Sequence, residues 1–85
     1  MRISARSDYA VRAVIEIAAA APKLVKADQI AEAQHIPIKF LENILADLRR
    51  AGIVRSKRGA EGGYVLGYGP KDLSVAHVMR SVEGP

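Results

Sequence analysis

The feature that most constrains the fold is an amphipathic segment at residues 37–51, followed at once by a hairpin pattern. At about 100° per residue, its apolar side chains form one continuous face and its polar side chains the opposite one, which predicts a helix. Pro37 suits the first turn of this helix because its missing N–H is not needed there, and Gly52 suits the left-handed position after its end. The apolar face consists of Phe40, Leu41, Ile44, Leu45 and Leu48, and the polar face of Lys39, Glu42, Asn43, Ala46 and Arg50.

The hairpin pattern occupies residues 53–67. Residues 53–57 nearly alternate between apolar and polar types, as a strand does, and residues 64–67 indicate a second strand. The stretch 58–63 between them contains three glycines, which accept the positive φ values that tight turns need. The sequence therefore predicts a two-stranded hairpin with a glycine-rich tip.

The N-terminal part of the chain predicts a long helix. Residues 4–20 carry small and apolar side chains at helical spacing, with Ser4 placed to cap the helix and Pro22 placed to stop it. The alternation at residues 23–26 then indicates a short edge strand.

Two shorter helices complete the pattern. Residues 27–34 predict a helix that a tight turn at His35-Ile36 joins to the segment 37–51, and Ser74 is expected to begin the last helix. The order is helix, short strand, helix, turn, helix, hairpin. We therefore predict a mostly α fold with a small β-hairpin, a winged helix-turn-helix, in one domain over residues 1–85.

The composition limits the class of protein. Hydrophobic residues make up 49% of the 85, which is enough for one compact core, and the chain has no cysteine. Disulfides and thiolate metal sites are therefore excluded within this chain. Neither a membrane-spanning run nor the apolar core of a signal peptide is found, so we expect a soluble, cytoplasmic protein.

The net charge of +4 is concentrated in one quarter of the sequence. Residues 37–58 contain six basic and two acidic side chains, whereas the remainder of the chain is balanced. The excess coincides with the predicted third helix and hairpin. A focused basic region of this kind is typical of proteins that bind nucleic acid.

These segments resemble the Rrf-two (IscR/NsrR/CymR-like) family of bacterial transcription regulators, and the resemblance covers the whole chain. The hairpin tip and the stretch before it are the most specific parts. The matching segments are Met1-Arg2-Ile3-Ser4, Asp8-Tyr9-Ala10-Val11-Arg12-Ala13, Gln29-Ile30-Ala31-Glu32, Phe40-Leu41-Glu42-Asn43-Ile44-Leu45, Leu48-Arg49-Arg50-Ala51-Gly52-Ile53-Val54, Ser56-Lys57-Arg58-Gly59-Ala60-Glu61-Gly62-Gly63-Tyr64 and Val82-Glu83-Gly84-Pro85.

The resemblance implies a sequence-specific repressor that binds double-stranded DNA as a homodimer, with helix 37–51 in the major groove and the wing, residues 56–64, in the minor groove. In this family a longer helix after the Glu-Gly-Pro segment pairs the subunits, and a sensor segment accompanies it. We expect the chain to be the N-terminal DNA-binding part of such a protein. The signal, the operator and the oligomeric state of the 85 residues stay open.

The resemblance also raises the question of an iron–sulfur cluster. Cluster-binding members carry cysteines beyond the matched region, and some use an acidic residue at the position of Asp8 as a ligand. Asp8 also suits a simpler role, because an acid in the first turn of a helix stabilises the helix dipole. We favour that role, and expect no cofactor in this chain, although a longer parent protein can hold a cluster.

Helix 37–51 carries the expected base reader. The carboxylate of Glu42 can accept from a cytosine amino group, and the matching family position reads a base; the alternative is a surface ion pair with Lys39. Lys39 and Pro37 replace residue types that are common in the family, which leaves the operator sequence in doubt. Asn43 completes the exposed face.

The wing is expected to hold Arg58 in a narrow minor groove, although a solvated turn arginine is the alternative. Gly59, Gly62 and Gly63 allow the backbone to approach DNA closely. Phosphate contacts, which set register and salt dependence, are expected from Ser56, Lys57, Arg49 and Arg50.

Other functions fit the sequence less well. A winged helix can act as a protein-interaction module, but this requires an exposed apolar stripe on helix 37–51, where the polar face lies. No nucleophile motif and no phosphate-binding glycine loop before a helix are present, so we expect no enzymatic activity. His35 and His77 lie far apart in sequence and predict no metal site. Tyr9 and Tyr64 are expected to pack within the fold.

Overall fold

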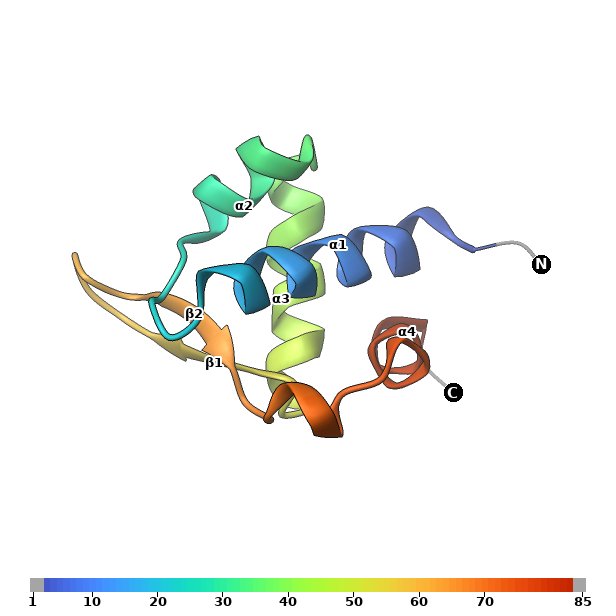
Figure 1. Cartoon of the computed structure of the whole chain (residues 1–85). Helices are drawn as coiled ribbons and strands as arrows, with labels where there is room; N and C mark the ends of the chain where they lie inside the picture. The colour runs from blue at the N-terminus through green and yellow to red at the C-terminus, as the bar shows by residue number, and fades with distance from the viewer. Residues whose placement is uncertain (1–2, 84–85) are drawn as a thin grey trace.

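The computed structural model describes residues 3–83 and contains four α-helices, a short 3-10 helix and a two-stranded antiparallel hairpin. In Figure 1, α1 crosses in front of α3 and the hairpin extends away from the helices. Met1, Arg2, Gly84 and Pro85, which belong to two of the matched motifs, lie outside the described residues. The elements are α1 (Ala5–Ala20), α2 (Ala27–Gln34), α3 (Ile38–Arg50), β1 (Val54–Lys57), β2 (Gly63–Leu66), η1 (Pro70–Asp72) and α4 (Val75–Glu83).

The predicted caps of α1 and α4 are confirmed, whereas the third helix is one residue shorter at each end than the predicted 37–51, because Pro37 is its N-cap residue and Ala51 its C-cap residue. The Ser7 N–H donates to Ser4 Oγ at 3.1 Å, so Ser4 caps α1, and the His77 N–H donates to Ser74 Oγ at 3.1 Å, so Ser74 caps α4. Gly52 follows α3 with φ of 78°, the left-handed value that glycine adopts without strain.

The connection between α2 and α3 is a tight turn. His35 adopts a left-handed conformation with φ of 52°, and the Ile36 N–H donates to the Ala31 carbonyl at 2.9 Å. Arg12 of α1 fixes the end of α2, because its guanidinium donates to the Gln34 carbonyl and, at 3.1 Å, to the Gln34 side chain. Hydrogen bonds from α1 therefore fix the position of the helix-turn-helix at the end of α2.

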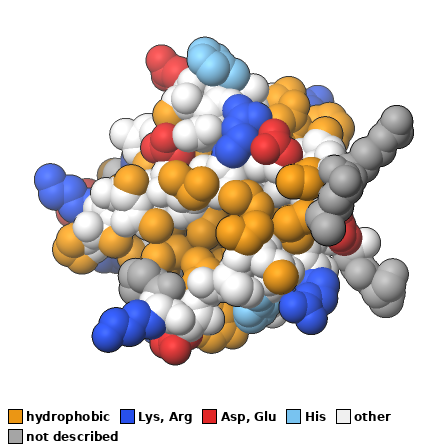
Figure 2. All heavy atoms as spheres, turned by 45° about the vertical axis from the view of Figure 1, so that its right-hand side comes forward, with side chains coloured by type: hydrophobic (Ala, Val, Ile, Leu, Met, Phe, Trp, Pro, Cys, Tyr) orange, Lys and Arg blue, Asp and Glu red, His pale blue; other side chains and the backbone are white. Residues whose placement is uncertain are grey.

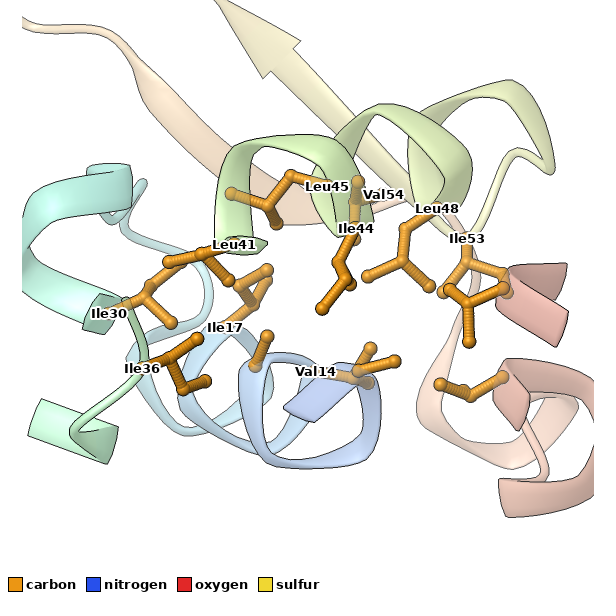
Figure 3. Packing of buried hydrophobic residues seen from close by; sticks show 14 residues of the cluster. Val14, Ile17, Ile30, Ile36, Leu41, Ile44, Leu45, Leu48, Ile53 and Val54 are labelled. Carbon is orange, nitrogen blue, oxygen red and sulfur yellow. The ribbon is translucent and has the colours of Figure 1, made fainter. Parts of the chain in front are cut away.

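The core lies where α3 meets the other helices and the start of the hairpin. Figure 3 shows the side chains of α3 directed towards Val14 and Ile17 of α1, with Ile30 at one end and Ile53 at the other. The four α3 residues that contribute are completely buried: Leu41, Ile44, Leu45 and Leu48. This packing fixes the rotation of α3, so its polar face must point outward.

The hairpin spans residues 54–66 and contains the predicted wing, residues 56–64. Ser56 pairs with Tyr64, and Lys57 with Gly63. On its other edge, Tyr64 exchanges two backbone hydrogen bonds with Val25, of 2.8 and 3.0 Å. The wing is therefore attached to the segment between α1 and α2 as well as to the end of α3.

Two expectations are corrected. Phe40, predicted on the buried face of α3, is 54% exposed, because it lies at the flank of the apolar face in the first turns of α3, where it forms a T-shaped pair with the Tyr9 ring. The edge strand expected at residues 23–26 is reduced to the single bridge at Val25, since α2 begins at Ala27 and leaves no length for a strand.

Candidate nucleic-acid interface

A cationic cleft lies between the wing, the start of α2 and the second half of α3. It has a volume of about 290 Å³ and is lined by the side chains of Lys26, Arg49, Lys57 and Arg58. None of the described residues that line it is acidic, and none of the four cations forms an ion pair within residues 3–83. Like charges that line a concave surface reinforce each other's field, so the cationic cleft suits a polyanion.

Glycines shape the tip of the wing. Gly59 has φ of 109° and open space around it, and its carbonyl accepts from the Gly62 N–H at 3.0 Å. Gly62 is buried, and a Cβ on it would lie 2.0 Å from the Lys57 carbonyl oxygen. Gly63 similarly allows the close approach of Val25, whose carbonyl oxygen would be 2.8 Å from an added Cβ. These glycines hold Lys57 and Arg58 at the mouth of the cationic cleft.

The outward face of α3 carries the predicted base-reading side chains. Pro37, Lys39, Glu42 and Asn43 are all exposed, with Pro37 just before the first residue of α3. Glu42 forms no ion pair with any residue that the structure describes, Lys39 included. Its carboxylate therefore remains free to accept hydrogen bonds from outside the chain.

The structure divides the predicted residues into two groups. Arg49, Ser56, Lys57, Arg58, Gly59 and Gly62 come together in the cationic cleft. Lys39 and Asn43 instead border a second hollow, between α3 and α1, together with Arg6 and Phe40. Arg50 is exposed and forms an ion pair with Asp47 of the same helix.

Lys26 was not predicted to belong to the interface. It immediately precedes α2, the first helix of the helix-turn-helix, and lines the cationic cleft opposite the wing. The first helix of this motif crosses the DNA backbone, so a basic residue at the start of that helix is the sequence signal that could have predicted a phosphate contact at Lys26.

The residues of this chain do not fit an iron or iron–sulfur site. The chain has no cysteine, and within residues 3–83 no three side chains of the His, Cys, Asp or Glu types lie close enough to hold a metal ion. Asp8 is exposed in the first turn of α1 and accepts a hydrogen bond from Arg12 at 3.1 Å.

A different face is apolar. Figure 2 shows hydrophobic side chains gathered in the centre of one face. Two of the exposed hydrophobic residues are Ile15 of α1 and Val75 of α4, which are 57% and 59% exposed. They border a small hollow with Val11 and Leu73. Within residues 3–83, no helix is both long and apolar enough to cross a membrane.

The arrangement defines the class of protein. A helix-turn-helix with an exposed polar second helix, followed by a hairpin that borders a cationic cleft, is a winged helix-turn-helix. A family model described as "Iron-dependent Transcriptional regulator", that of Rrf2 (Rrf-two), matches residues 3–85. The chain therefore belongs to the Rrf2 family.

Relatives with curated names agree with this assignment. An HTH-type transcriptional regulator of Mycobacterium tuberculosis is 49% identical over 86 residues, which cover 100% of this chain and 53% of the relative. An rrf2-like regulator of Rhodobacter capsulatus is 40% identical, over 98% of this chain and 58% of the relative. The chain thus spans little more than half the length of these relatives.

Solved structures show the same fold. CymR, the global cysteine regulator of B. subtilis, superposes with a TM-score of 0.93 at 35% identity, over 100% of this chain and 67% of CymR. IscR of T. potens gives a TM-score of 0.91 at 38% identity, over 99% of this chain and 62% of IscR.

Proposed function

We propose that this chain is the DNA-binding unit of a transcriptional repressor, which reads its operator with α3 in the major groove and the wing in the minor groove. The observation that carries the proposal is the cationic cleft, because its four cations, which form no ion pair within residues 3–83, lie where α2, α3 and the wing converge. The phosphate groups of a DNA strand match this group of cations in charge.

The proposed division of roles follows from exposure and charge. Lys26, Arg49, Lys57 and Ser56 contact phosphates, and Arg58 enters the minor groove from the tip of the wing. Glu42, unpaired on the outward face of α3, reads a cytosine amino group. Lys39, Asn43 and Arg50 lie along the same helix and face the groove edges.

The parent protein is proposed to act as a homodimer in the cytoplasm on a near-palindromic operator, as the family resemblance implies. Residues 1–85 supply the DNA-binding part. If a parent protein holds an iron–sulfur cluster, its cysteine ligands lie outside these residues, because this chain has none. We assign no enzymatic activity, in keeping with membership of a family of transcription regulators.

A protein-interaction role for the winged helix has less support. It needs an apolar stripe along the outward face of α3, and two apolar residues of α3, Ile38 and Phe40, are exposed. These two residues are two positions apart and therefore point about 200° apart around the helix. They lie on opposite flanks of α3, with Lys39 between them, and form no stripe.

The test is equilibrium binding of the chain to mixed-sequence duplex DNA over a range of salt concentrations. The three cationic phosphate contacts, from Lys26, Arg49 and Lys57, predict that log affinity falls against log salt with a slope of about −3. Lys57→Ala should weaken binding and lower that slope by about 1, and Arg58→Ala, which removes the minor-groove contact, should weaken binding as well. Arg80→Ala, an exposed cation on α4 outside the cationic cleft, is the matched control. No binding at low salt would contradict the proposal.

The base-reading role of Glu42 needs a separate measurement. Glu42→Ala should reduce discrimination at one base pair by about 1–3 kcal/mol, measured as the ratio of affinities for the preferred duplex and its single-base variants. An unchanged ratio at every position would show that Glu42 reads no base.

A further inference from the structure

Arg6 of α1 connects the outward face of α3 with the last turn of α4. Its Nε donates to the Val82 carbonyl of α4 at 2.8 Å, and its Nη2 donates to Asn43 Oδ1 of α3, also at 2.8 Å. The same Nη2 forms an ion pair with Asp47 of α3. The Val82 carbonyl is one of the four at the end of a helix that have no partner within the helix. One guanidinium therefore joins three helices.

This connection is partly shielded from water and is reinforced at both ends. The side chains of Arg6 and Asp47 are 30% and 18% exposed. Beside Arg6, Ser7 Oγ donates to the Glu83 carboxylate at 2.5 Å, which attaches the end of α4 to α1 a second time. Asp47 also pairs with Arg50 of its own helix.

The contact decides which end of the Asn43 amide faces outward. Arginine carries donors and no acceptor, so the atom of Asn43 that faces Arg6 must be its oxygen. The amide NH₂ group of the exposed Asn43 is then directed away from Arg6. In the major groove, guanine presents the acceptors N7 and O6, adenine N7 and thymine O4, which such a donor matches, whereas cytosine presents only a donor.

The contact also removes an electrostatic obstacle. A free carboxylate on a DNA-reading helix repels phosphate groups, and Asp47 lies one turn after Asn43. Arg6 and Arg50 both bind this carboxylate, so its charge is compensated from the α1 side and from α3 itself.

We propose that Arg6 is a positioning residue for base recognition: it holds Asn43 as a hydrogen-bond donor towards the major groove and couples this orientation to the last turn of α4. The inference rests on the proposed function. It follows that base preference depends on where the end of α4 lies, because a shift of the Val82 carbonyl moves the guanidinium that orients Asn43.

The test compares base preference, not affinity alone, by sequencing the duplexes that the chain binds from a random library. Arg6→Lys keeps the charge, but a single Nζ cannot reach Val82, Asn43 and Asp47 together. At one base position this variant should reduce the discrimination against cytosine by about fivefold or more. Arg80→Lys, the same change at an exposed position of α4, is the matched control and should leave the preference unchanged.

A double-mutant comparison separates positioning from a general structural effect. If Arg6 acts through Asn43, then Arg6→Lys made in an Asn43→Ala background should cause no further change at that position. Equal changes in both backgrounds, or no change in either, would overturn the inference. In the absence of DNA, the NMR signals of the Asn43 side-chain amide should shift in Arg6→Lys, and unshifted signals would also overturn it.

Different results would contradict the proposed DNA-binding function and the positioning role of Arg6. If the unchanged chain enriches no sequence and shows no salt-dependent binding, the proposed function is wrong and the role of Arg6 in recognition is wrong with it. If the unchanged chain enriches a site and Arg6→Lys enriches the same site equally well, the function stands and the positioning role is wrong. Thermal unfolding of each variant verifies that it is folded.

Discussion

Gly62→Ala is the sharpest test of how the wing is built. An added Cβ would lie 2.0 Å from the Lys57 carbonyl oxygen and 2.9 Å from the carbonyl carbons of Lys57 and Arg58. All three are backbone atoms, so no side chain can rotate away and the turn itself must open. The hydrogen bond from the Gly62 N–H to the Gly59 carbonyl, now 3.0 Å, would be lost in the process.

The expected loss of stability can be worked out from these contacts. Forcing extra atoms into a packed site costs about 1–3 kcal/mol, and the lost hydrogen bond adds about 1 kcal/mol. We therefore expect the free energy of unfolding to fall by about 2–4 kcal/mol, which for a domain of this size lowers Tm by roughly 8 °C or more. DNA affinity should fall as well, since Lys57 and Arg58 would leave their places in the cationic cleft.

The assay is urea unfolding followed by circular dichroism, together with fluorescence anisotropy on a labelled mixed-sequence duplex. Gly69→Ala is the matched control, because its nearest described neighbour, Asp72 Oδ2, would be in ordinary contact at 3.5 Å from the new Cβ. If both variants were equally stable, the tight turn would be refuted. If Gly62→Ala were less stable but bound DNA as before, the turn would not determine the shape of the cationic cleft.

Two further predictions concern stability alone and use the same unfolding assay. Leu45→Ala removes a completely buried side chain and should lower the free energy of unfolding by about 2–5 kcal/mol. Ile15→Ala, at a position that is 57% exposed, is the control and should lower it by less than about 1 kcal/mol. Equal decreases would contradict the packing of α3. Ser4→Ala removes the oxygen that caps the Ser7 N–H and should lower the free energy of unfolding by about 1 kcal/mol. Ser56→Ala, on the exposed strand, is the control and should change it by less than about 0.5 kcal/mol. If Ser4→Ala left the free energy of unfolding unchanged, the cap would be contradicted.

Local sequence signals predicted the elements well. The bounds of α2 agree with the predicted residues 27–34, Ser4 caps α1 as expected, and Gly52, Gly59 and Gly63 have the expected positive φ, whereas Gly62 does not. Each of these features depends on neighbours within a few residues, so composition and spacing are sufficient to reveal it.

Contacts between distant segments could not be predicted in this way. The pairing of Arg6 with Asp47, 41 residues further along, has no periodic signature, and neither does the position of Lys26 opposite Arg58. Phe40 was misplaced for a related reason. Periodicity gives the angle of a side chain around its own helix, but whether a flank is covered depends on the neighbouring helix, which here contacts Phe40 through the ring of Tyr9.

The two hydrogen bonds between Val25 and Tyr64 have a thermodynamic consequence for recognition. A hairpin attached at one end explores many orientations, and immobilising it on a ligand costs conformational entropy of about 1–2 kcal/mol for each residue that becomes ordered. Here the second attachment restricts the hairpin when the chain folds, before any DNA arrives. Association then needs little ordering of the backbone, and more of the interaction energy appears as affinity.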